Sequence, residues 1–151
     1  MFRRKPTVLC IDDEYNQLIG YKALLEQTGY RVLAATSASE GLEMFYAHPV
    51  DAVVLDYRMP GMEGDVVAAR MKIINAQVPI MLLSGCQGLS KNKLKCIDAA
   101  VSKGQSPTVF LSTLNALLNG PSFFNRWLAA WQEKGSKAVM PPHTGNKKLP
   151  S

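Results

Sequence analysis

Acidic, hydroxyl and basic side chains stand at the ends of four separate apolar runs of this 151-residue sequence. These residues are Asp12 and Asp13 after residues 7–11, Asp56 after residues 52–55, Ser84 after residues 78–83, and Lys103 close after residues 99–101. Three neighbouring carboxylates repel one another, and a divalent cation with oxygen ligands, such as magnesium, relieves that repulsion. A carboxylate can also attack phosphorus, while a cation and a hydroxyl neutralise the phosphoryl oxygens. The residue types therefore predict a magnesium site at which Asp56 accepts a phosphoryl group.

The run that ends at Asp56 indicates how these side chains are positioned. Residues 52–55 are apolar without polar alternation, which is typical of a strand buried on both faces of a parallel sheet. Asp56 then lies at the carboxyl end of that strand, where open α/β sheets bind their ligands. Pro60, Gly61 and Gly64 favour a tight loop after it, and the backbone carbonyl of Arg58 in that loop is a further candidate metal ligand.

Apolar runs and helical periodicities alternate along the first 120 residues. The expected strands are 7–11, 30–34, 52–56, 78–84 and 99–102, and the expected helices are 15–27, 37–47, 65–75, a short 90–97, and 107–119. Five strands alternating with five helices over short connections predict a doubly wound parallel sheet. The carboxyl ends of its strands would bring the polar residues together at one edge.

Local signals support several of these boundaries. Gly29 is expected to end the first helix, and Ser37 with Glu40 three residues later forms a possible capping box for the second. Ser106 followed by Pro107 is a favourable helix start. The expected short helix carries three lysines, interpreted as a solvated face: Lys91, Lys93 and Lys95.

The composition, 47% hydrophobic and 19% charged residues, is that of a globular domain, and no apolar run reaches the roughly 18 residues of a membrane span. The net charge of +5 is concentrated in residues 121–151, which hold five of the basic residues and one acidic residue. A nucleic-acid groove on the domain is therefore not indicated. Three cysteines without metal-ligand spacing indicate free thiols, and we expect a cytoplasmic location.

Residues 121–151 form an appendage to the expected domain of residues 1–120. We expect an amphipathic helix within residues 121–135, with an aromatic stripe that includes Phe124, Trp127 and Trp131, and a flexible basic tail over residues 136–151. These residues are too few for a DNA-binding output domain with its own core.

The sequence resembles the receiver domain of bacterial two-component response regulators over about residues 5–120. Four stretches carry the resemblance: residues 8–14 (VLCIDDE), 54–64 (VLDYRMPGMEG), 80–85 (IMLLSG) and 101–103 (VSK). It implies a flavodoxin-like strand order 2-1-3-4-5 and a phosphoryl group donated to Asp56 by a histidine kinase or a histidine phosphotransfer protein. It also implies magnesium at Asp12, Asp13 and Asp56, with switching through Ser84 and Lys103.

The sequence departs from the family pattern at several positions. Ala100 replaces the aromatic or histidine switch residue expected three positions before the lysine, and Gly104 replaces the usual proline after it. Arg58 and Cys86 occupy the positions at which the family tunes dephosphorylation.

Three functions remain open. The first is a stand-alone receiver without enzymatic turnover, whose phosphorylation switches contacts with a downstream protein that the sequence does not name. The second is a degenerate receiver that carries no phosphate and serves as an interaction or homodimerisation scaffold. The third is an aspartate-nucleophile phosphatase of the haloacid-dehalogenase type, which needs a second acid two residues after the nucleophile, where this chain has Arg58.

Overall fold

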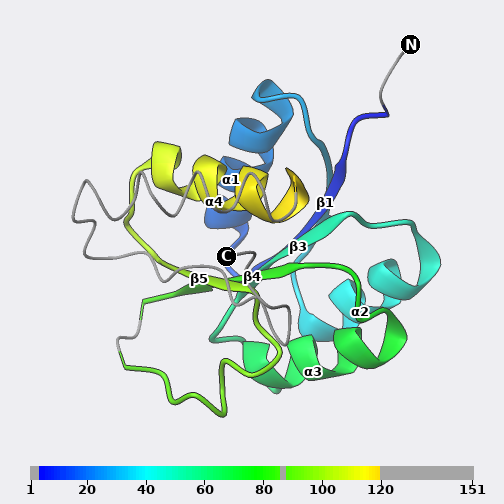
Figure 1. Ribbon diagram of the computed structural model, residues 1–151, viewed down its shortest axis with the longest axis vertical. Coiled ribbons are helices and arrows are strands. Elements are labelled where there is room, and N and C mark those ends of the chain that lie inside the picture. The colour runs from blue at the N-terminus through cyan, green and yellow to red at the C-terminus, as the bar shows by residue number, and fades with distance from the viewer. Residues whose placement is uncertain (1–3, 86–87, 120–151) are drawn as a thin grey trace, which may run out of the picture.

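Five parallel strands form one sheet in the order β2-β1-β3-β4-β5, in a computed structural model that describes residues 4–85 and 88–119. The strands are β1 (Thr7–Ile11), β2 (Arg31–Ala35), β3 (Ala52–Asp56), β4 (Ile80–Ser84) and β5 (Ala99–Ser102). The helices are α1 (Tyr15–Gln27), α2 (Ala38–Ala47), α3 (Gly64–Ile74) and α4 (Pro107–Asn119). Helices α1 and α4 cover one face of the sheet, and α2 and α3 cover the other (Figure 1). The predicted doubly wound parallel sheet and its strand order are confirmed.

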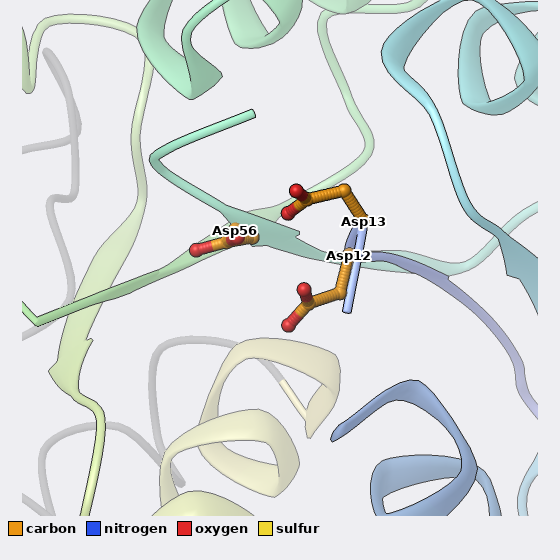
Figure 2. A group of neighbouring side chains, drawn as sticks. All are labelled: Asp12, Asp13 and Asp56. Carbon is orange, nitrogen blue, oxygen red and sulfur yellow. The ribbon is translucent and has the colours of Figure 1, made fainter. Parts of the chain in front are cut away.

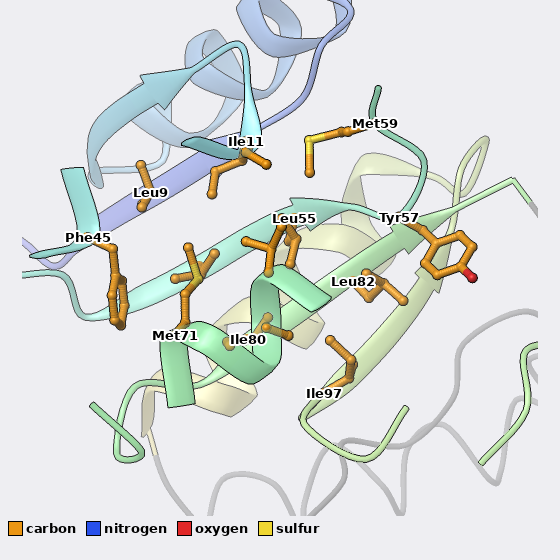
Figure 3. Packing of buried hydrophobic residues seen from close by; sticks show 14 of the residues in the cluster. Leu9, Ile11, Phe45, Leu55, Tyr57, Met59, Met71, Ile80, Leu82 and Ile97 are labelled. Carbon is orange, nitrogen blue, oxygen red and sulfur yellow. The ribbon is translucent and has the colours of Figure 1, made fainter. Parts of the chain in front are cut away.

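Both faces of the sheet are buried because side chains alternate between two apolar clusters along each central strand. In β3, Val53 and Leu55 join the cluster under α2 and α3, whereas Ala52 and Val54 join the cluster under α1 and α4. Figure 3 shows the first cluster, in which Phe45 and Met71 from the helices pack against the strands. All five residues of β3 are buried, as the unbroken apolar run predicts.

Two predicted helix boundaries are confirmed, the start of α2 and the end of α1. The Ser37 hydroxyl accepts a hydrogen bond from the amide of Glu40 (3.1 Å), and the Glu40 carboxylate accepts one from the amide of Thr36 (3.3 Å). Gly29 has a φ of 104°, the left-handed conformation that ends α1. Two strands begin later than expected: the amide of Tyr30 still bonds to α1, and Pro79 has no amide to donate to a ladder.

The short helix predicted over residues 90–97 is wrong, because the chain there forms consecutive turns. The amide of Lys93 donates a hydrogen bond to the carbonyl of Ser90 (3.0 Å), and the amide of Ile97 donates one to the carbonyl of Leu94 (3.0 Å). Leu94 and Ile97 are both buried. Two apolar residues three apart can be buried by a tight turn as well as by an α-helix, and a segment this short gains little from helix propagation. The described residues therefore contain four α-helices where five were expected.

An ion pair fastens this segment to the sheet. The ammonium of Lys72 on α3 lies 2.8 Å from Asp98 Oδ2, and the same carboxylate oxygen accepts the amide of Ile80 at the start of β4 (2.8 Å). The segment that leads into β5 is thereby held against α3 without helical structure of its own.

Gly64 brings the start of α3 against the end of β3. Its amide donates to the carbonyl of Tyr57 (2.7 Å), and a Cβ at this position would lie 2.8 Å from the carbonyl oxygen of Asp56 and 2.9 Å from the Cα of Tyr57. Both atoms belong to the backbone, so neither can move without displacing the strand tip that carries Asp56.

We therefore predict that Gly64→Ala lowers the free energy of unfolding by about 1–3 kcal/mol, the usual cost of overpacking. Gly20 on α1 is the matched control, because a Cβ there meets nothing within 4 Å. Gly20→Ala should raise the stability by about 0.5–1 kcal/mol, as in other helix interiors. Urea denaturation of both variants checks the prediction, and equal effects of the two substitutions would contradict it.

No helix in the described part of the chain is long and apolar enough to cross a membrane. The helix expected within residues 121–135, the tail over residues 136–151, and Cys86 lie outside the described residues.

Candidate functional site

Three carboxylates meet at the carboxyl edge of the sheet. Asp12 and Asp13 directly follow β1, and Asp56 ends the adjacent strand β3 (Figure 2). Each offers one oxygen, and the three oxygens lie within 4.8 Å of one another. Asp12 and Asp56 are buried, whereas Asp13 is exposed. The predicted acidic cluster therefore forms because β1 and β3 are neighbours that end at the same level.

Lys103 brings a positive charge to this cluster from the end of β5. Its ammonium lies 2.9 Å from Asp56 Oδ1 and 3.9 Å from Asp12 Oδ2. The backbone amide of Lys103 donates to the carbonyl of Ser84 (2.9 Å), which fixes the lysine to the neighbouring strand β4. Burial opposes the charge of Lys103, but the hydrogen bond to Asp56 and the negative charge of Asp12 outweigh it and raise the pKa of the ammonium.

Burial and neighbouring charges perturb the pKa of Asp12. Burial is the main cause, and the charge of Asp56 adds to it, so that the pKa of Asp12 rises to about 6 although the amide of Glu14 donates to its Oδ1 (2.9 Å). Its other oxygen, Oδ2, is one of two buried side-chain polar atoms in the described residues that have no hydrogen-bond partner. The contact of this atom with Lys103 is too long for a hydrogen bond.

The donor set fits a hard divalent cation. Carboxylate oxygens are the ligands that magnesium prefers, and a magnesium ion typically takes one or two protein carboxylates and keeps several waters. The buried, unpartnered Oδ2 of Asp12 is an atom that such an ion would satisfy. Asp12, Asp13 and Asp56 are therefore the residues that could hold it.

The remaining predicted residues lie around the cluster. Ser84 ends β4 and is buried, in register with Ser102 of β5. Arg58 is exposed in the loop after Asp56. Ala100 lies in β5 opposite Leu82 and packs against the cluster under α2 and α3. Cys86 is not among the described residues.

One feature of the site was missed by sequence reasoning. The buried ring of Tyr57 follows Asp56, and its hydroxyl donates to Glu63 Oε2 (3.0 Å), which also accepts from the ammonium of Lys93 (3.1 Å). Lys93 lies over the Tyr57 ring, 5.6 Å from its centroid. These contacts with Lys93 and Tyr57 lower the pKa of Glu63, and those with Tyr57 and Glu63 raise the pKa of Lys93.

The Lys93 side chain is 41% exposed, as a solvated lysine would be, but it lies on a turn and not on a helix, and it pairs with Glu63. We name the three residues Tyr57, Glu63 and Lys93 the clasp, because they join the loop after β3 to the turns that follow β4. Glu63 lies within a motif stretch of the sequence, but nothing in its spacing indicates a lysine 30 positions away as its partner.

The raised pKa of Asp12 predicts a pH dependence of stability. Its ordinary pKa is 3.8, so between that value and about 6 the folded state binds more protons than the unfolded state. Stability must then fall as pH rises through this window, by about 3 kcal/mol in total. Without divalent cations, the protein should be about 1–2 kcal/mol less stable at about pH 7 than at about pH 5.

Urea denaturation in a chelating buffer measures this difference, and Asp12→Asn should remove most of it. Magnesium chloride should restore stability at neutral pH, because a bound cation relieves the repulsion between the carboxylates. A stability that rises between these two pH values in the unmodified protein, or a fall that Asp12→Asn leaves intact, would show that Asp12 does not control it.

Residues 8–104 match the response regulator receiver domain family. The autoinducer 1 sensor kinase/phosphatase LuxN of Vibrio campbellii is 35% identical over 116 residues, which cover 76% of this chain and 13% of LuxN. Sporulation initiation phosphotransferase F of Bacillus subtilis is 27% identical over 77 residues, which cover 51% of this chain and 62% of that protein. The chain thus aligns with only part of each of these two relatives.

Solved structures show the same architecture. The response regulator TrrA of Thermotoga maritima, in complex with Mg(2+)-BeF, is 28% identical with a TM-score of 0.72, and the match covers 75% of this chain and 99% of that one. A CheY-like receiver domain from Methanospirillum hungatei JF-1 is 24% identical with a TM-score of 0.74, over 88% and 100% of the two chains. At that identity, the second structure supports the fold alone.

Proposed function

Because the chain belongs to the response regulator receiver domain family, we propose that Asp56 accepts a phosphoryl group and that this modification switches the contacts of the protein. The observation that carries the proposal is the placement of the Asp56 carboxylate, 2.9 Å from the ammonium of Lys103 and within 4.8 Å of two further carboxylates. A buried acid held by a cation beside a candidate metal site is suited to phosphoryl transfer.

In the proposed step, a carboxylate oxygen of Asp56 attacks the phosphorus of a phosphohistidine. The new O–P bond forms as the P–N bond to the imidazole breaks, and the leaving nitrogen keeps the electron pair. Lys103 then lies beside the phosphoryl oxygens, where its raised pKa keeps it charged. Ser84, buried at the neighbouring strand tip, offers a hydroxyl donor to the same oxygens.

Asp12, Asp13 and Asp56, with the backbone carbonyl of Arg58 as a further proposed ligand, would hold a divalent cation, which would supply positive charge for the transferring group. The chain's own contribution is to hold the carboxylates together: Glu14 fixes Oδ1 of Asp12, and Lys103 fixes Oδ1 of Asp56. Both contacts exist before any phosphoryl donor arrives, so the site is preorganised.

The proposed partners are a histidine kinase or a histidine phosphotransfer protein as donor and a protein target for output. LuxN and other relatives of this chain are sensor kinases, which supports a histidine-containing donor. Residues 4–85 and 88–119 consist of the sheet, its helices and their connections, so this part holds no separate DNA-binding domain. We further propose that residues 1–120 are the receiver unit and that it works in the cytoplasm.

Because Ala100 stands in place of a switch aromatic, the effect of phosphorylation at Asp56 must reach the protein surface through other contacts. The clasp could provide these contacts, because Tyr57 directly follows Asp56 and Lys93 belongs to the turns after β4.

We propose that dephosphorylation is tuned from position 58, where Arg58 is exposed in the loop next to the site, and from Cys86 after β4.

Incubation with acetyl phosphate and magnesium chloride tests the proposal. Intact-mass measurement should detect one added phosphoryl group per chain, and a chelator should prevent it. Beryllofluoride should bind with the same requirement for magnesium. Neither adduct under any condition would favour the scaffold function, and steady release of product from a chromogenic phosphate ester would favour the phosphatase function.

A further inference from the structure

A cavity of about 360 Å³ lies at the amino-terminal edge of the sheet, opposite the carboxylates. Its apolar wall is formed by Pro6 before β1, Tyr30 before β2, and Leu118 near the end of α4. The volume is at the lower end of the roughly 300–1,000 Å³ typical of small-ligand pockets. Nothing in the proposed phosphoryl chemistry uses this cavity.

Polar groups form the rest of the wall. Arg4 and Asp51 form an ion pair across it (3.0 Å), and Asp51 also accepts the amide of Thr7 (2.7 Å). Both charges therefore already have a partner, so the described residues that line the cavity offer no unpaired charge to select an ionic ligand. A mainly apolar occupant with few charges fits it best.

The chain itself supplies such an occupant. Asn119, the last residue of α4, lines the cavity, and the aromatic residues Phe123, Phe124, Trp127 and Trp131 follow it within twelve positions. Four residues of extended chain span at most about 14 Å, so Phe123 cannot lie far from the cavity mouth. The exposed apolar side chains of the other helices, among them Tyr15 and Ile19 on α1 and Tyr46 and Ile73 on α2 and α3, do not line the cavity.

We propose that this cavity binds the aromatic segment of residues 123–131 of the same chain. A short tether gives the segment an effective concentration in the millimolar range, so that the segment occupies the cavity most of the time even if its intrinsic affinity is weak. Each aromatic side chain can bury about 150–250 Å² of surface. The segment has one charge, Arg126, so its aromatic residues can be buried without desolvating several ions.

Tryptophan fluorescence reports on the segment alone, because Trp127 and Trp131 are the two tryptophans of the chain. In the full chain we expect emission at shorter wavelength than N-acetyltryptophanamide, and protection from acrylamide quenching. The emission wavelength and the protection should both be independent of protein concentration, and light scattering should give the mass of one chain. Emission and quenching equal to those of the free amide would overturn the proposal.

Asn115→Arg places a long charged side chain on the cavity wall, and we expect it to shift the emission to longer wavelength and to abolish the protection. Asn92→Arg, on an exposed residue that does not line the cavity, is the matched control and should change neither. If Asn115→Arg fails to fold by circular dichroism, Asn119→Arg at the exposed end of α4 serves the same purpose.

Two further outcomes would overturn the proposal. Tryptophans that stay protected in the folded cavity variants would place the segment elsewhere. Protection that rises with protein concentration, together with the mass of two chains, would assign the segment to a second copy instead.

Discussion

Asp56→Asn is expected to abolish covalent phosphorylation completely. The substitution keeps the size of the side chain but removes the carboxylate that attacks phosphorus, and an amide oxygen is a poor nucleophile. Asp12 does not share the close lysine contact of Asp56, because the Lys103 ammonium lies 2.9 Å from Asp56 Oδ1 and 3.9 Å from Asp12 Oδ2. Intact-mass measurement after incubation with acetyl phosphate and magnesium should show unmodified protein.

Asp13→Asn is the informative comparison, because it removes a candidate metal ligand and leaves the proposed nucleophile in place. This variant should still be labelled, more slowly and at higher magnesium concentration, because the cation keeps two of its three carboxylates. If Asp56→Asn were labelled as fast as the unmodified protein, another residue would be the phosphoacceptor.

Lys103→Met is expected to slow phosphorylation of Asp56 by about 100-fold, the usual effect of removing one preorganised charge from a transition state. It should also lower the free energy of unfolding by about 3 kcal/mol at neutral pH, at the lower end of the range for a broken buried ion pair. The lower end applies because the Lys103 side chain is 24% exposed, whereas that of Asp56 is 4% exposed.

Lys91→Met is the control for Lys103→Met, because it removes the same charge from an exposed position away from the site. Its stability should change by less than about 0.5 kcal/mol. Lys103→Arg should recover most of the stability but only part of the rate, because a planar guanidinium does not reproduce the compact ammonium. Equal rates in Lys103→Met and Lys91→Met would exclude a role of Lys103 in transfer.

The residues of the site could be predicted because each one ends an apolar run. A strand buried on both faces is easily recognised, and the polar residue that follows it must lie at the carboxyl edge of a parallel sheet. That reasoning placed Asp12, Asp56 and Lys103 together without knowledge of the strand order. The order itself came from the family resemblance, because hydrophobic periodicity does not encode which strands are neighbours.

The clasp could not be predicted from the sequence. It joins Glu63 to Lys93 across 30 positions, and Lys93 lies in turns at a place where a helix was expected. The spacing of Leu94 and Ile97 is compatible with both conformations. The environment of Asp12 could be predicted only in part. Repulsion between the acids could be expected from the sequence. The unpartnered Oδ2, however, depends on a position of Lys103 that no sequence pattern specifies.

We propose that Asp56 is the one carboxylate of the cluster that accepts the phosphoryl group. Borohydride reduction of the phosphorylated protein converts an aspartyl phosphate to homoserine, which peptide mass spectrometry locates. We expect homoserine at position 56, in an amount that depends on magnesium. Homoserine at position 12 or 13, or a phosphorylated protein that yields none, would contradict it.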